Sequence, residues 1–358
     1  MLRAAPSRTD LPYPVLSETG NDEVAGATRQ LFRIIEANLG EKAPEDVEVF
    51  DLFNNSVIRE VFLKAFALQA EVEDPRTLPS SVFSSISAQQ SWQHLVWRLN
   101  GRRVYDLSSQ LTASLLQTSL ARLSGTDVPI PVPSFYLRVA DSDKLGLTVW
   151  NAQTGEHKLD GFYVSARANR LFVLATGLPH EGAQKGDDAL CTYTIDLDIP
   201  DLEEATENFL LLNEKKLEQN TNRAHDWLRI ILGFCLYLTC EDADVEKRRL
   251  GPTDAVRARA KKLGGKAGKK LLEQATLPVH YLRVGYREQQ SVELENVAGA
   301  SDEVKKLTKR FVVRGHFRQQ AHGPNRTLRK TIFVRSFWKG PPWGELATSI
   351  TRVRSTTE

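Results

Sequence analysis

The segment Asp127-Val-Pro-Ile-Pro-Val-Pro-Ser-Phe-Tyr-Leu137 divides the chain into two parts of different character. It carries a proline at every second position, and proline both fixes its own φ and restricts the residue before it. The segment is therefore extended backbone and not helix. We expect a boundary here, between a mainly helical region at 1–126 and an α+β region at 127–358, in an arrangement that is also compatible with one continuous globular unit.

Before this segment, apolar residues recur at helical spacing in four stretches, at 21–39, 51–66, 84–99 and 106–120. Gly101 follows the third stretch, as glycine often follows a helix, and Asp106 stands where an N-cap is expected for the fourth. The sequence thus predicts a helical first third.

After the segment, short apolar runs separated by Gly, Asp and Asn predict strands. The runs fall at 134–139, 145–150, 161–164, 170–175 and 191–197, and a later one at 279–286. Helical spacing at 202–219 and 224–240 separates these strands. The basic stretch 246–268, which contains Gly264, Gly265 and Gly268, is expected to be a mobile loop. This order favours an α+β fold with a mostly antiparallel sheet and flanking helices over a doubly wound α/β fold.

Bulk composition is that of a folded protein of 358 residues, with 26% charged residues. Three cysteines are too few for a disulfide framework and fit a reducing cytoplasm. The N-terminus shows no signal-peptide pattern. The longest apolar stretch, 227–240, is shorter than the roughly 20 residues of a membrane span, so no membrane partner is expected.

The net charge of +2 conceals strong segregation. Residues 245–285 carry +8 and residues 301–358 carry +9, whereas residues 1–60 carry −5 and residues 187–218 carry −8. Two interpretations stay open: the blocks neutralise each other within the fold, or they form an exposed basic surface for an anionic partner.

The C-terminal block predicts a basic β-hairpin at 310–340. In its first strand, Phe311, Val313 and Phe317 alternate with Arg314, His316 and Arg318, which gives one apolar and one cationic face. A loop at 323–325 and a second strand at 330–338 follow. The cationic face is suited to an anion such as phosphate, an acidic peptide or a carboxylate-rich surface. The candidate binding residues are Arg314, His316, Arg318, His322, Arg326, Arg329, Arg335, Trp338 and Lys339.

No motif for a nucleotide, a metal or another cofactor is present, so no cofactor, metal ligand or catalytic residue is assigned. His316 and His322 lie six residues apart among arginines. General acid–base cleavage of a phosphodiester by this pair, a metal-independent ribonuclease, is the least favoured hypothesis.

Three groups of residues resemble a family of phage and mobile-element proteins. They are Tyr105-Asp-Leu-x-x-x-Leu-x-x-x-Leu-Leu-x-Thr with Pro133-Ser-Phe-Tyr-Leu; Leu236-Tyr-Leu-Thr; and Val313-Arg-Gly-His-Phe-Arg-x-Gln-x-x-Gly with Phe333-Val-Arg-Ser-Phe-Trp-Lys-Gly. The resemblance covers roughly residues 90–350, and its terminal motif is the most specific. Lys339 departs from the pattern, because relatives often have arginine before that glycine.

The family's characterised member is a type V anti-CRISPR protein. The resemblance implies a cytoplasmic, non-enzymatic protein in a bacterial host that lowers production of the type V effector nuclease. It implies recognition of the effector's nascent N-terminal peptide and loss of its mRNA, with the ribosome or mRNA as further partners. The alternative is a nucleic-acid-binding regulator of a mobile element, which the two basic blocks also favour.

Overall fold

The computed structural model describes most of the chain between residues 12 and 346. The described residues are 12–15, 30, 32–34, 37, 56–69, 72–77, 86–120, 123–178, 189–203, 220–248, 254–275, 279–287, 309–313, 316–334, 337–339 and 345–346. The expected helix at 21–39 and the expected helix at 202–219 fall almost wholly outside them.

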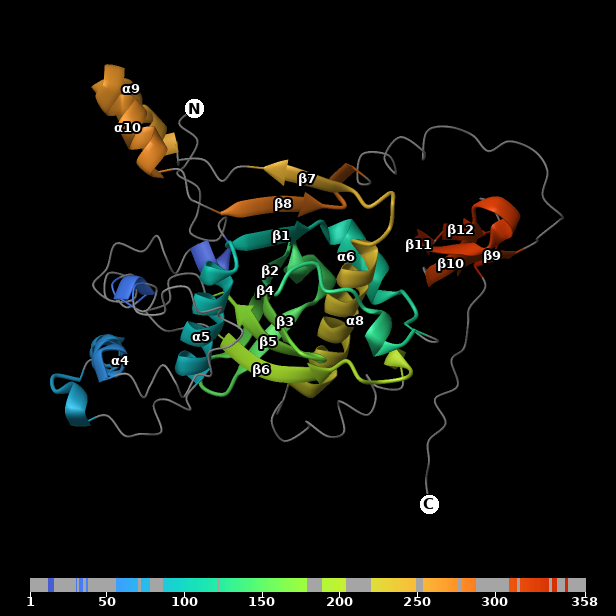
Figure 1. Cartoon of the computed structure of the whole chain (residues 1–358), viewed down its shortest axis with the longest axis horizontal. Helices are drawn as coiled ribbons and strands as arrows, with labels where there is room; N and C mark the ends of the chain where they lie inside the picture. Colours follow the sequence, from blue (N-terminus) through green and yellow to red (C-terminus); the bar gives the residue numbers. More distant parts are fainter. Residues whose placement is uncertain are drawn as a thin grey trace.

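One mixed sheet forms the centre of the protein (Figure 1). Its strands run in the order β6-β5-β4-β2-β1-β8-β7, and β3 pairs with β4 outside this path. Their bounds are β1 Arg103–Leu107, β2 Ser134–Val139, β3 Thr148–Asn151, β4 Gly155–Arg167, β5 Arg170–Gly177, β6 Ala189–Asp196, β7 Val245–Arg248 and β8 His280–Val284. The α+β class is confirmed. The sheet is mixed because β1 runs parallel to both β2 and β8, while the other pairs are antiparallel.

The strand β1 corrects the expectation of helix throughout the first third. It lies between β2 and β8, so tertiary pairing on both edges decides its conformation. Asp106 is a strand residue and not an N-cap. The helix α6, Ser109–Leu116, is capped by Ser108, whose side chain accepts a hydrogen bond from the Leu111 amide at 3.1 Å. Gly101 follows helix α5 with a φ of +88°, which suits its expected place after a helix.

Helices cover both faces of the sheet. On one face, α6 and α8, Thr221–Tyr237, pack on buried side chains such as Phe135 and Phe162. On the other face, α5, Ile86–Leu99, contributes Trp97 to a smaller cluster with Tyr136 and Tyr163. Helix α4, Ser56–Gln69, precedes α5 in the chain. The apolar stretch expected at 224–240 is therefore a buried core helix, and no described helix is long and apolar enough to cross a membrane.

The expectation of a mobile loop at 246–268 is wrong. The structure forms β7, then helix α9, Asp254–Leu263, and helix α10, Gly265–Ala275. The lysines, arginines and alanines of this stretch are good helix formers, and two of its glycines make the turn between the helices. The glycines thus indicate a tight connection between two helices and not a long loop.

The expected strands at 134–139, 170–175, 191–197 and 279–286 are confirmed within two residues at each end. The strand expected at 161–164 is the middle of the longer β4, which pairs with β3 through its first part and with β2 through its last part. The strand expected at 145–150 begins later, because Ser142–Leu145 form a 3-10 turn.

Candidate functional site

The expected C-terminal hairpin is present as two ladders with one register. Strand β10, His316–His322, pairs antiparallel with β11, Leu328–Val334. Strand β9, Lys309–Val313, pairs antiparallel with β12, Phe337–Lys339, and in parallel with β13, Glu345–Leu346. The β9–β12 pairs continue the register of the β10–β11 pairs, so the two ladders follow one hairpin.

One face of the β10–β11 hairpin is fixed to the body of the protein. Phe317 and Phe333 are cross-strand partners whose ring centroids lie 5.0 Å apart. Phe333 also meets Tyr237 at the end of α8, edge to face, at 5.7 Å between centroids. Because Phe333 is only 8% exposed and belongs to the main core, this aromatic contact anchors the hairpin.

The opposite face combines cationic and apolar side chains. Arg318 is exposed and pairs with Ile332, and His322 pairs with Leu328, which is 53% exposed. The connecting turn, Pro324–Arg326, leaves Arg326 exposed. This face therefore offers an exposed cation on β10 beside apolar side chains of β11.

The nine candidate residues are placed to different degrees. Arg318, His322 and Arg326 lie together on the β10–β11 hairpin and its turn. Arg314 and Arg335 lie outside the described residues. For His316, Arg329, Trp338 and Lys339 the structure places the strand positions alone, in β10, β11 and β12.

The strand geometry weighs against the two histidines acting as an acid–base pair. His316 and His322 are the first and last residues of the same extended strand. At roughly 3.3 Å per residue their Cα atoms are about 20 Å apart, too far for both side chains to reach one phosphodiester. Among the described residues, no group of three or more His, Cys, Asp or Glu side chains is placed to hold a metal ion.

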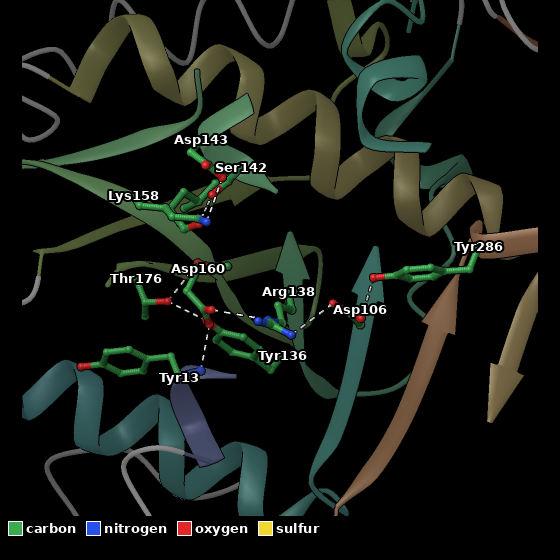
Figure 2. Close-up of polar contacts among 12 residues, drawn as sticks. Tyr13, Asp106, Tyr136, Arg138, Ser142, Asp143, Lys158, Asp160, Thr176 and Tyr286 are labelled. Atoms are coloured by element: carbon green, nitrogen blue, oxygen red, sulfur yellow. Dashed lines mark hydrogen bonds and ion pairs between the residues drawn. The ribbon is translucent and has the colours of Figure 1, made fainter. Parts of the chain in front are cut away.

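A buried ionic network on the α5 face of the sheet was not foreseen (Figure 2). Arg138 of β2 lies between two carboxylates, with Nε 3.5 Å from Asp160 Oδ1 and Nη1 3.8 Å from Asp106 Oδ1. The Tyr136 hydroxyl and the Tyr13 amide both donate to Asp160 Oδ2, at 2.5 and 2.8 Å. The network thus ties β1, β2, β4 and an N-terminal segment together.

Tyrosines complete the network at the β8 side. The Tyr286 hydroxyl donates to Asp106 Oδ2 at 2.7 Å, and the Arg283 guanidinium lies 3.5 Å from the centre of the Tyr286 ring. On the other side, the Thr176 hydroxyl lies 2.7 Å from that of Tyr136. Each carboxylate therefore has a tyrosine hydroxyl in addition to the arginine.

The electrostatics of the network follow from its burial. Burial raises the pKa of Asp160, while the charge of Arg138 and the hydrogen bonds from Tyr136 and Tyr13 act in the opposite direction. Burial disfavours the Arg138 cation, but Asp160 and Asp106 more than compensate and raise its pKa. Burial, with the neighbouring Asp160, also raises the pKa of Tyr136. Arg138 is thus a permanent cation, so the network joins charged groups that need each other to stay buried.

A sequence signal for this network existed. Asp106 and Arg138 each interrupt an apolar strand, between Tyr105 and Leu107 and between Leu137 and Val139. Charged residues in buried strands are rare unless paired. Their pairing depends on the parallel register of β1 and β2, in which Asp106 and Arg138 are direct partners, and a single sequence does not supply that register.

Comparison with known proteins identifies the family. The profile of the AcrVA2-like family, described as the anti-CRISPR type V subtype A2 family, matches residues 105–338. The match runs from β1 to β12 and covers well over half of the chain. The chain belongs to this family of anti-CRISPR proteins, as the resemblance in its motifs implied.

The comparisons with solved structures and with curated proteins do not carry the family assignment. Among solved structures, the crystal structure of AcrVA2 matches with 12% sequence identity and a TM-score of 0.45, covering 91% of this chain and 96% of that one. No curated protein matches the chain. The assignment therefore rests on the family profile.

Proposed function

We propose that this protein lowers production of the type V-A effector nuclease in the cytoplasm of a bacterial host, by recognising the effector's nascent N-terminal peptide and promoting loss of its mRNA. The observation that carries the proposal is membership of the anti-CRISPR type V subtype A2 family over residues 105–338. The matched region includes both strands of the anchored β10–β11 hairpin, the surface to which we assign the recognition.

The hairpin face suits an extended peptide better than a bare phosphate. Arg318 on β10 can pair with carboxylates or carbonyl oxygens. Opposite Arg318 and His322, on β11, lie Ile332 and the exposed Leu328, which offer contact to apolar side chains. A nascent peptide presents both kinds of group, and pockets for alternate side chains are how extended peptides are selected.

Anchoring makes this face a preformed surface. Phe317 and Phe333 hold the opposite side of the hairpin against Tyr237. The backbone of the exposed face therefore needs little ordering on binding, which lowers the entropic cost of association.

Co-expression with a type V-A effector tests the proposal. The wild-type chain should lower both effector protein and effector transcript, and R318A/R326A should restore both. The matched control is R170A, because Arg170 is an exposed arginine of β5 whose ion pair with Asp196 is also exposed. Unchanged effector protein and transcript beside the wild-type chain would contradict the proposal.

A nucleic-acid-binding regulator of a mobile element is the second candidate. The observation that favours it is the strong positive charge of residues 245–285 and 301–358. It predicts steeply salt-dependent binding to RNA or DNA, with no dependence on the effector's N-terminal peptide.

A further inference from the structure

Helices α9 and α10 form a basic hairpin that projects from the sheet beyond β7 and β8 (Figure 1). Residues 254–275 contain seven Lys and Arg against two Asp and Glu, a net charge of +5. All seven cations are exposed: Arg257, Arg259, Lys261, Lys262, Lys266, Lys269 and Lys270. The concentration of charge on a projecting element is distinct from the C-terminal hairpin and from the buried Arg138 network.

Close packing gives this hairpin a defined shape. A Cβ atom on Gly268 would lie 2.3 Å from the Ala260 carbonyl oxygen, so the two helices approach closely where Gly268 meets Ala260. Gly264 and Gly265 form the turn with φ of +61° and +48°, a backbone conformation that glycine adopts readily. The cations are therefore displayed on a compact element and not on a freely moving loop.

We propose that the α9–α10 hairpin binds the phosphate backbone of structured RNA. This inference rests on the proposed function, because RNA is the polyanion present where a nascent peptide and its message are handled. Around α9, Arg257 and Arg259 lie about 160° apart, on nearly opposite sides of the helix, since residues advance by about 100° each. Charge on several sides matches a partner whose phosphates flank the element, such as a folded RNA.

The pattern is not that of a membrane-binding helix. Such a helix needs a continuous apolar face opposite its cations. On this hairpin, Leu263 at the turn is 53% exposed, whereas Leu271 and Leu272 are partly buried. A single exposed leucine at the tip gives little apolar area to insert into lipid.

The experiment measures binding of the full chain to a fluorescently labelled stem–loop RNA over a range of salt concentrations. The variant K261Q/K262Q/K269Q/K270Q removes four charges, and Gln and Lys have similar helix propensities, so the helices should persist. The matched control K261R/K262R/K269R/K270R keeps every charge. Circular dichroism of both variants checks that helix content is unchanged.

We expect the Gln variant to bind the RNA at least tenfold more weakly, and the Arg control to bind like the wild type. The slope of log K against log salt should fall by roughly three for the Gln variant, since each lost phosphate contact removes about 0.7–0.9. Equal RNA affinity of the Gln variant and the wild type would overturn the inference. So would tighter binding to an acidic peptide or to anionic vesicles than to the RNA.

Failure of this inference is distinguishable from failure of the proposed function. If the Gln variant keeps full RNA affinity while the wild-type chain still lowers effector protein, the RNA site is wrong and the proposed function stands. If the wild type leaves effector protein unchanged but binds RNA through these lysines, the proposed function fails and the RNA site stands.

Discussion

Replacing Arg138 by methionine should destabilise the protein far more than the same change at an exposed arginine. The Arg138 side chain is 19% exposed, and those of Asp106 and Asp160 are 5% and 2% exposed. R138M keeps similar bulk but leaves two carboxylates buried without their cation. Removing one partner of a buried ion pair costs about 3–5 kcal/mol of the free energy of unfolding.

The loss should also depend on pH. Burial already raises the pKa of Asp160 above 3.8, and removing the opposing charge of Arg138 raises it further. A carboxyl whose pKa is higher in the folded state contributes stability below its unfolded pKa and loses it as pH rises through the folded pKa. The deficit of R138M should therefore be smallest near pH 4 and should grow as the pH rises.

Urea unfolding of the wild type and R138M across this pH range measures both effects. The matched control is R170M, because Arg170 and Asp196 form an ion pair 3.6 Å long whose side chains are 61% and 50% exposed. We expect R170M to change the free energy of unfolding by less than about 1 kcal/mol. A deficit for R138M as small as that of R170M, or one that does not change with pH, would refute the reasoning.

Two further substitutions and one labelling experiment test separate parts of the structure. F333A removes the ring that contacts Tyr237 and should lower the free energy of unfolding in urea by about 3–5 kcal/mol. The hairpin should also become sensitive to limited proteolysis. Unchanged resistance to the protease would show that the anchor is not needed. G285A should lower the free energy of unfolding by at least about 1 kcal/mol, because φ is +77° and the new Cβ would lie 2.6 Å from Leu111 Cβ; a stability equal to the wild type would contradict this. Burial raises the pKa of the Cys235 thiol to about 12. Iodoacetamide at pH 8 should therefore alkylate Cys235 in the denatured protein but not in the native protein. Equal labelling of the native and denatured protein would contradict the burial of this thiol.

Much of the fold could be predicted because local signals carry it. The short apolar strand β2 and the apolar helix α8 appear at their expected places, since the apolar pattern and the flanking turn residues determine them. Strand β1 was not expected from the sequence, because it is only five residues long and lies between two helices. Pairing with β2 and β8 on both edges stabilises it. Helices α9 and α10 were missed because three glycines outweighed the helix formers in the sequence interpretation.

The candidate site was predicted to a similar degree. Alternation assigns Arg318 to the cationic face of a hairpin strand, and the structure places Arg318 exposed on β10 and Arg326 exposed in the connecting turn, while their role in binding stays a prediction. The anchoring of that hairpin by Phe333 on Tyr237 joins residues almost a hundred positions apart, which no local pattern shows. The Arg138 network likewise depends on strand register, so the sequence shows its charges but not their pairing.

The central claim is that this chain recognises the effector's nascent N-terminal peptide. The most direct measurement is recovery of the full chain from cells translating the type V-A effector, with bound protein and bound RNA both identified. The account predicts recovery of the effector's N-terminal segment together with its own message, and loss of both with R318A/R326A. Recovery of RNA without selection for that peptide or its message would contradict the account.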